Sequence, residues 1–150
     1  NMDAIYLYPS LCFFEGTPVS IGRGTDKPFQ QFGHPAFMLY SYVFTPKPMY
    51  GAKDPRLKGV NCYSRLLTKD AERLKNNGMI DLQWLIDSYS QYPEKEEFFT
   101  NFFLLLAGTK QLEAQIKADL SAEQIRASWK PGLEKFQKEV RSKYVLYEDF

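Results

Sequence analysis

The sequence is poor in the residues that build metal and disulfide sites. Its 150 residues contain one histidine, His34, and two cysteines, Cys12 and Cys62. No Cys/His spacing of the zinc-binding type occurs, so we expect no metal site. The cysteines leave two alternatives open, because they could pair in an oxidising compartment or both be buried thiols. His34 stands between Gly33 and Pro35, which predicts a surface turn rather than a catalytic base.

The sequence also has little net charge and no long apolar run. Nineteen Lys and Arg residues face eighteen Asp and Glu residues, for a net charge of +1. This balance gives no electrostatic case for a nucleic-acid partner or an anionic membrane surface. The apolar stretch around residues 104–106 falls well short of the ~20 residues that cross a bilayer, so we expect no membrane span. An apolar content of 44% and this length fit a single domain over residues 1–150.

Hydrophobic periodicity divides the chain into two parts. Residues 1–66 have the pattern of strands and long loops, and residues 69–142 that of helices. We therefore predict an α+β fold, with a small mixed sheet from the N-terminal half packed with helices from the C-terminal half. Strands are predicted at 4–8 (stopped by Pro9), 29–32, 40–45 and 60–66, and the tail at 144–147 could return as an edge strand.

Helix signals are clear in the second part. Asp81 is placed as an N-cap, and Ser121 begins a capping box with Gln124. Pro131 lies inside the last pattern and predicts a break or kink near residues 128–130. Apolar residues at spacings of three and four along that pattern are expected to face the core; they are Ile125, Trp129, Leu133, Phe136 and Val140.

Residues 15–29 concentrate polar side chains and glycines. The segment holds Glu15, Arg23, three hydroxyl residues and three glycines, which a core strand does not need but a site for a polar or anionic ligand does. An arginine matches carboxylate or phosphate, and glycines let the backbone approach a ligand. The alternative is a polar turn between strands in which Glu15 and Arg23 form a structural ion pair, and both interpretations stay open.

This segment resembles the signature of the NamZ-type exo-β-N-acetylmuramidases, which are bacterial peptidoglycan-recycling glycosidases. The first matches are YPSLCFFEGT at 8–17, VSIGRGT at 19–25 and KPF at 27–29. Weaker matches cover nearly all the rest of the chain: FTP at 44–46, DLQWLI at 81–86, LAGT at 106–109, SW at 128–129 and KYVLY at 143–147. At position 34 the family more often has a small residue, which further lowers any catalytic role for His34.

The resemblance implies the C-terminal domain of a two-domain glycosidase that hydrolyses terminal β-1,4-linked N-acetylmuramic acid. In that family the proposed catalytic carboxylate lies in an N-terminal Rossmann-like domain, which is absent from this chain, and the active cleft lies between the domains. The expected partners are therefore the protein's own N-terminal catalytic domain and muropeptides, with no cofactor. We expect the chain to complete the substrate cleft and to be inactive alone. The resemblance also implies a periplasmic or secreted location, although no signal-peptide pattern is visible in these 150 residues.

The substrate then suggests roles for the polar segment. N-acetylmuramic acid carries a lactyl carboxylate that N-acetylglucosamine lacks, so a specific enzyme needs a cation nearby. Arg23, flanked by Gly22 and Gly24, is the candidate for that cation. Glu15 is a weaker candidate for a catalytic carboxylate, since glycosidases generally use two. Substrate-binding or turn-capping hydroxyls are Thr17, Ser20 and Thr25.

Other functional classes remain to be distinguished. A non-catalytic carbohydrate-binding module would need the same polar segment without an acid. A purely structural domain would use the segment to pack on a neighbour. A phosphate-binding loop at residues 22–25 is disfavoured, because the segment lacks the Walker spacing and its lysine.

Overall fold

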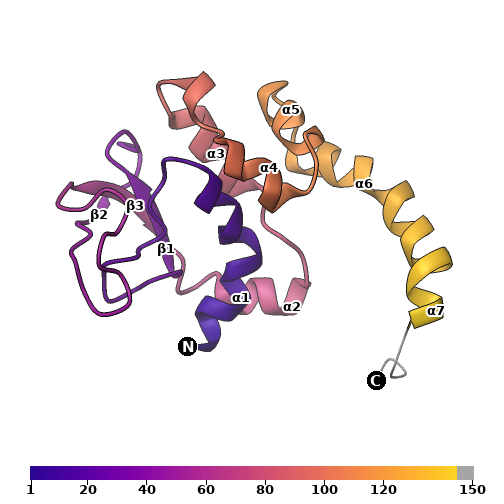
Figure 1. The fold of residues 1–150 in the computed structure, drawn as a ribbon, viewed down its shortest axis with the longest axis horizontal. Helices are drawn as coiled ribbons and strands as arrows, with labels where there is room; N and C mark the ends of the chain where they lie inside the picture. Colours follow the sequence, from indigo (N-terminus) through magenta and orange to yellow (C-terminus); the bar gives the residue numbers. More distant parts are fainter. Residues whose placement is uncertain (145–150) are drawn as a thin grey trace.

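The sheet is small and lies at one end of the molecule. The computed structural model describes residues 1–144, and its strands are β1 (Gln31–His34), β2 (Tyr42–Phe44) and β3 (Cys62–Leu66) (Figure 1). The strand order is β1-β3-β2, with Gln31 opposite Leu66 and Tyr42 opposite Ser64. Both pairings are antiparallel. The prediction of a mixed sheet is therefore wrong. The α+β class itself is confirmed.

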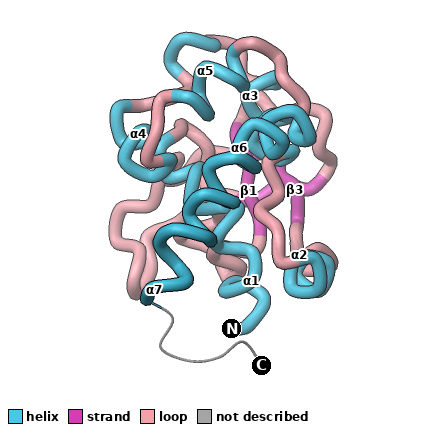
Figure 2. The backbone as a smooth tube through the Cα atoms, turned by 90° about the vertical axis from the view of Figure 1, so that its right-hand side faces the viewer, coloured by secondary structure: helices cyan, strands magenta, loops and turns pink. Residues whose placement is uncertain are grey.

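The helices lie to one side of this sheet, as two perpendicular views show (Figures 1 and 2). Among the described residues they are α1 (Met2–Leu11), η1 (Cys12–Gly16), α2 (Ala71–Asn77), α3 (Gln83–Gln91), η2 (Lys95–Glu97), α4 (Asn101–Ala107), α5 (Gln111–Lys117), α6 (Ala122–Phe136), η3 (Gln137–Arg141) and α7 (Ser142–Tyr144). No helix within residues 1–144 has the length and apolar character needed to cross a membrane.

The strand predicted at residues 4–8 is wrong, because this segment forms α1. Asn1 caps the helix, its side chain accepting a hydrogen bond from the backbone N–H of Ala4. Leu7 and Leu11, four residues apart, are fully buried, so tertiary packing overrides the β propensity of the segment. Pro9 is tolerated near the end of the helix, which tightens into the 3₁₀ turn of η1 three residues later.

The core is aromatic and joins the two halves of the chain. Phe14 and Phe32 stack with ring centroids 4.9 Å apart, and Phe32 also contacts Trp84 on α3 at 6.2 Å. All three side chains are essentially inaccessible to solvent. The site loops described below are therefore anchored on a rigid aromatic centre.

The helix-boundary predictions are confirmed in one case and changed in two. Ser121 and Gln124 form the predicted capping box of α6. The N-cap of α3 is Leu82 and not the predicted Asp81, although Oδ1 of Asp81 accepts a hydrogen bond from the backbone N–H of Gln83. Of the break or kink predicted near residues 128–130, the break does not occur, because α6 continues to Phe136. The carbonyl that loses its N–H partner at Pro131 belongs to Ala127, which is exposed, so water can hydrate it.

Three other expectations are changed by the structure. His34 is not a surface turn residue: it ends β1 half-buried, in ring contact with Phe37 and Tyr92. Cys12 and Cys62 are free thiols, so the disulfide alternative is not realised. Tyr144 closes α7, and the remainder of the tail predicted as an edge strand lies outside the described residues.

Candidate functional site

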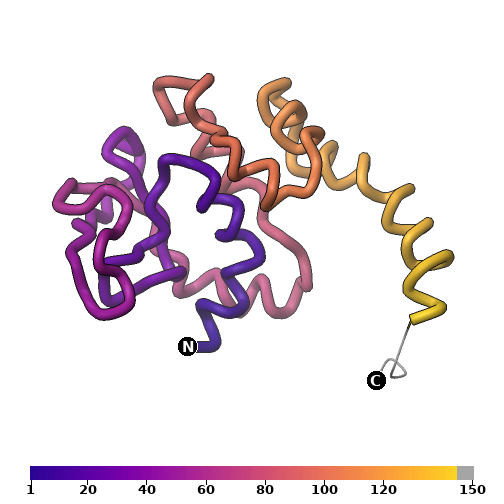
Figure 3. Tube along the Cα trace, viewed as in Figure 1, coloured from indigo at the N-terminus to yellow at the C-terminus, as the bar shows by residue number. Residues whose placement is uncertain are grey.

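An open pocket of about 920 Å³ lies where four segments of the chain meet. Its lining comes from Glu15 at the end of η1, from residues 19–21 with Arg23, from the loop at 51–57, and from Thr100 and Phe102 at the start of α4. The long loops that form one wall are visible at the sheet end of the molecule (Figure 3). The pocket thus brings together part of the polar segment and a second loop that the sequence left without a function.

Gly24 locks those two loops together. Its carbonyl accepts a hydrogen bond of 2.8 Å from the backbone N–H of Lys47, and its φ is +81°. A Cβ at this position would lie 2.6 Å from Cγ of Pro55 and 2.7 Å from the carbonyl oxygen of Lys47. The glycine is therefore required by packing between the protein's own loops, and not by the approach of a ligand.

The turn at residues 22–25 is closed on itself. Both the backbone N–H and the hydroxyl of Thr25 donate to the carbonyl of Gly22, at 3.2 Å and 2.7 Å. The same hydroxyl accepts hydrogen bonds from the Lys27 N–H and from Nε2 of Gln31. The N–H and hydroxyl of Thr25 are therefore occupied by hydrogen bonds within the protein, which gives no support to a phosphate-binding loop.

Thr17 has an equally local role. Its side chain is fully buried, and its hydroxyl donates to the carbonyl of Phe14 and accepts from the N–H of Val19. Thr17, Gly22, Gly24 and Thr25 all lie outside the pocket lining. The structure thus places these four candidates as residues that shape the loop, whereas Glu15, Ser20 and Arg23 reach the pocket.

Glu15 is held at the pocket wall by two neighbours. Its Oε1 accepts a hydrogen bond of 3.2 Å from the hydroxyl of Tyr8, and its backbone carbonyl accepts one of 3.3 Å from Arg56. The Glu15 carboxylate raises the pKa of Tyr8, and the nearby Arg23 lowers it to a smaller extent. Glu15, Tyr8 and Arg23 are therefore close enough to share one electrostatic environment.

Arg23 is exposed and lies against an aromatic ring. Its guanidinium carbon is 5.2 Å from the centroid of Phe29, a cation–π distance. The ion pairs found among residues 1–144 do not include Arg23, so the structural ion pair with Glu15 is not formed there. Its charge thus faces the pocket without a partner of opposite sign in direct contact.

Ser20 presents a buried hydroxyl that lacks a partner. Its side-chain oxygen is inaccessible to solvent and makes no hydrogen bond, although its backbone N–H and carbonyl pair with Gly33. A buried polar atom without a partner costs about 1–3 kcal/mol. Ser20 belongs to the pocket lining, but a bound group could reach the hydroxyl only if the atoms that cover it moved.

Sequence reasoning missed a second arginine in this pocket. Arg56 comes from the irregular loop at residues 47–60, and partial desolvation lowers its pKa while the Glu15 carboxylate opposes that effect. The one available signal was the charged run at 53–56 inside a proline- and glycine-rich loop. Arg56 and Arg23 give the pocket two guanidinium groups beside one hydrogen-bonded carboxylate.

The pocket lining offers hydrogen-bond donors and acceptors for a polar organic ligand. Within the described residues, no three His, Cys, Asp or Glu side chains gather in a way that could hold a metal ion. The second carboxylate of the lining, Asp54, pairs with Lys58 at 2.6 Å. Two arginines, a serine hydroxyl and Glu15 can together donate to and accept from a carboxylate-bearing, hydroxyl-rich molecule.

Comparisons of the sequence and the fold with known proteins show the family of this chain. The sequence model described as "Exo-beta-N-acetylmuramidase NamZ, C-terminal" matches residues 6–147. A peptidoglycan β-N-acetylmuramidase NamZ from Bacillus subtilis (strain 168) is 28% identical, over 98% of this chain and 38% of the relative. A crystal structure of a DUF1343 family protein from Bacteroides fragilis NCTC 9343 is 45% identical, with a TM-score of 0.93. It covers 100% of this chain, which spans 42% of that protein.

These matches agree in extent and in fold. The family model covers all but eight residues of the chain, and the crystal structure superposes along the whole of it. This chain spans about two fifths of the length of both relatives. The chain belongs to the family of C-terminal domains of NamZ-type exo-β-N-acetylmuramidases.

Proposed function

We propose that this domain forms part of the substrate site of a peptidoglycan exo-β-N-acetylmuramidase. The observation that carries the proposal is the pocket in which Arg23, free of ion pairs within residues 1–144, lies with Glu15 and the unpartnered hydroxyl of Ser20. Family membership supplies the substrate class. The pocket is open on one side, as a site completed by further chain would be.

Each side chain then has a chemical role. Arg23 binds the lactyl carboxylate that distinguishes N-acetylmuramic acid, because a guanidinium donates two parallel hydrogen bonds to a carboxylate. Ser20 donates a hydrogen bond to a sugar or acetamido oxygen once the atoms that cover its hydroxyl shift on binding. Glu15, oriented by Tyr8, accepts from sugar hydroxyls or acts as one of the two carboxylates of the hydrolysis.

Arg56 supports this arrangement by its hydrogen bond to the backbone of Glu15. Its hydrogen bond to the Glu15 carbonyl fixes the end of η1 relative to the loop at 51–57. The remainder of the catalytic machinery is supplied by the rest of the polypeptide in the longer family members. The wider role would be recycling of cell-wall fragments, in the periplasm or outside the cell.

Hydrolysis of a chromogenic β-N-acetylmuraminide tests the split-site proposal. The assay compares the 150-residue chain with the longer polypeptide that contains it, at equal molar concentration. We expect turnover by the longer polypeptide and none above background by the chain alone. Turnover by the chain alone would place the whole catalytic machinery here, with Glu15 as its first candidate acid, and would overturn the proposal.

A further inference from the structure

The C-terminal helical arm carries an apolar stripe that nothing in the described structure covers. We use "arm" for residues 130–144, which comprise the end of α6, η3 and α7 and extend away from the rest of the molecule (Figures 1 and 3). Four large side chains on it are 41–75% exposed: Leu133, Phe136, Val140 and Tyr144. Spacings of three, four and four residues keep all four on roughly one side, although residues 137–141 form a π-helix with wider turns than an α-helix.

The stripe lies on the same face of the helical segment as the core residues of α6. Ile125 is fully buried and Trp129 is partly buried against the core, both on the same face of α6. Beyond Trp129 every described residue is exposed. The expectation that Leu133, Phe136 and Val140 are core residues is therefore wrong within this domain, although the pattern is that of a buried face.

Physical chemistry argues against a bare arm. Helices of about 12–15 residues without tertiary contacts are marginal in water, and most helical stability comes from packing of an apolar face. Two surface ion pairs along the arm, Lys130 with Glu134 and Lys135 with Glu139, are long at 4.0 Å and add at most a few tenths of a kcal/mol each. We therefore expect another surface to cover the stripe.

The size of the stripe favours a partner within the same polypeptide. Four partly exposed side chains offer on the order of 300–400 Å², well below the ~800 Å² that each copy contributes to a standard interface between separate proteins. A tethered partner needs less area, because its effective concentration is in the millimolar range. The longer relatives provide such a tethered partner, since this chain spans only 42% of the Bacteroides fragilis protein.

The same relative also constrains the direction of the arm. Residues 130–144 are one tenth of the 150 residues, so a TM-score above 0.90 requires that at least part of the arm superposes. The observed score is 0.93. At least part of the arm therefore follows the same course in a crystal structure whose chain is more than twice as long as this one.

We propose that the stripe of Leu133, Phe136, Val140 and Tyr144 is an intramolecular docking surface. In the longer polypeptide it packs on an apolar patch of the region that the relatives carry outside this domain, and so fixes the orientation of the substrate pocket relative to that region. The proposal rests on family membership and not on the substrate assigned to the pocket, so either can fail alone.

Hydrogen–deuterium exchange of residues 130–144 tests it. We expect exchange to be at least 10-fold slower in the longer polypeptide than in the 150-residue chain. Phe136→Asp should abolish most of that protection, because it places a charge in the stripe. Lys138→Asp, two residues away on the opposite side of the helix, is the matched control and should retain it. Since Phe136 is 52% exposed, neither variant should alter the melting temperature of the 150-residue chain.

Two results would overturn the proposal. Equal exchange in both proteins would mean that the longer polypeptide leaves the stripe uncovered. A concentration-dependent dimer of the 150-residue chain, measured by light scattering and dissociated by Phe136→Asp, would identify a second copy as the partner. A monomer at all concentrations, together with protection in the longer polypeptide, supports intramolecular docking.

Discussion

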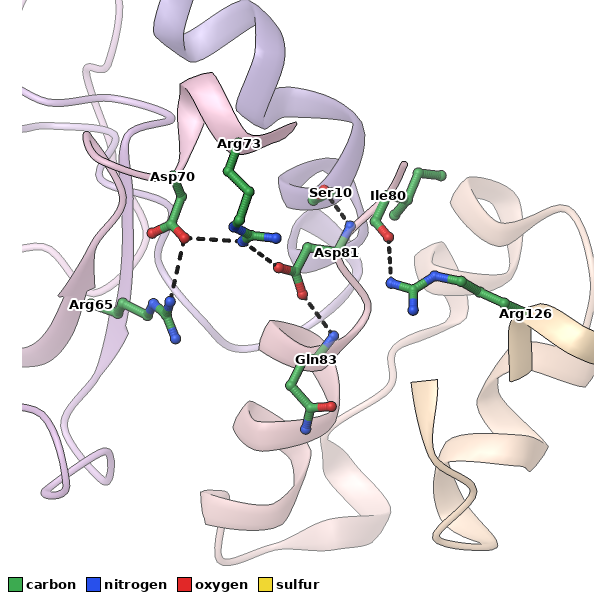
Figure 4. Close-up of polar contacts among 8 residues, drawn as sticks. All are labelled: Ser10, Arg65, Asp70, Arg73, Ile80, Asp81, Gln83 and Arg126. Atoms are coloured by element: carbon green, nitrogen blue, oxygen red, sulfur yellow. Dashed lines mark hydrogen bonds and ion pairs between the residues drawn. The ribbon is translucent and has the colours of Figure 1, made fainter. Parts of the chain in front are cut away.

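The Nη2 of Arg73 lies 2.6 Å from the Oδ2 of Asp81, and this contact ties α2 to the start of α3 (Figure 4). The same nitrogen is 3.0 Å from Oδ1 of Asp70, so one guanidinium bridges two carboxylates. The backbone N–H of Asp81 in turn donates to the hydroxyl of Ser10 on α1. The contact therefore joins three helical segments beside the ring of Trp84, which lies 5.9 Å from the Arg73 guanidinium.

Removing this bridge should destabilise the fold. Arg73→Ala leaves the mostly buried Asp81 carboxylate without its cation, and we expect the free energy of unfolding to fall by about 1–3 kcal/mol. Urea denaturation measures the change. Lys58→Ala is the control, because its ion pair with Asp54 is solvent-exposed and should contribute less than about 0.5 kcal/mol. Equal effects of the two substitutions would contradict the structural role of Arg73.

Gly24 and Gly51 offer a matched pair for the loop junction at the pocket. Both have positive φ, +81° and +82°, but only Gly24 has atoms within contact distance of an added Cβ. Each Gly→Ala substitution costs roughly 1–2 kcal/mol for the backbone conformation. Gly24→Ala should cost about 1–3 kcal/mol more, from overpacking against Pro55 and Lys47. Thermal unfolding distinguishes them, and equal losses would show that the two loops do not pack as described.

The pKa of His34 should lie below the ordinary value for a histidine side chain. Burial against Phe37 and Tyr92 lowers the pKa of His34 from 6.5, with Glu94 opposing the shift. The unfolded chain therefore binds a proton at higher pH than the folded chain, and stability falls as pH decreases through about 6.5. Because the chain has one histidine, a single imidazole proton resonance reports the pKa. A folded value at or above 6.5 would contradict the half-buried placement, and His34→Gln should remove this component of the pH dependence.

The Cys62 thiol should react slowly with alkylating reagents. Burial raises the pKa of Cys62 to about 11, so its thiolate fraction at pH 8 is roughly 100-fold lower than that of an unfolded thiol with a pKa near 9. In a Cys12→Ser background, iodoacetamide should modify the folded protein at least 100-fold more slowly than the urea-unfolded protein at pH 8. The rate should rise as the pH approaches 11. Equal rates in the two states would show that Cys62 is accessible.

The sequence predicted those features that depend on local patterns. The capping box at Ser121, the strand near residues 60–66 and the helical second half all follow from short-range chemistry that tertiary contacts do not override. The segment at 4–8 failed because its β-rich composition is outweighed by burial of Leu7 and Leu11 on one helical face. The core prediction for residues 133–140 failed because their pattern describes a surface that residues 1–144 do not cover.

The candidate site was predictable only in part. Glu15, Ser20 and Arg23 could be proposed because they cluster in one segment. The arrival of Arg56 depends on a loop that is folded back over 41 residues of sequence separation, which no local pattern encodes. Which glycines shape the loop and which face a ligand likewise depends on the packing of Pro55 against Gly24.

The most direct test of the central claim is the kinetics of Arg23→Ala in the longer polypeptide. If Arg23 binds the lactyl carboxylate, kcat/KM for a chromogenic β-N-acetylmuraminide should fall by about 10- to 150-fold, the equivalent of roughly 1.5–3 kcal/mol. Arg23→Lys should recover part of the loss, and Lys69→Ala, at an exposed lysine outside the pocket lining, should leave activity unchanged. The melting temperature should stay within about 2 °C, because Arg23 is exposed and makes no ion pair among residues 1–144. Unchanged kcat/KM, or a loss of activity that only follows a loss of stability, would contradict the assignment of this pocket to the substrate.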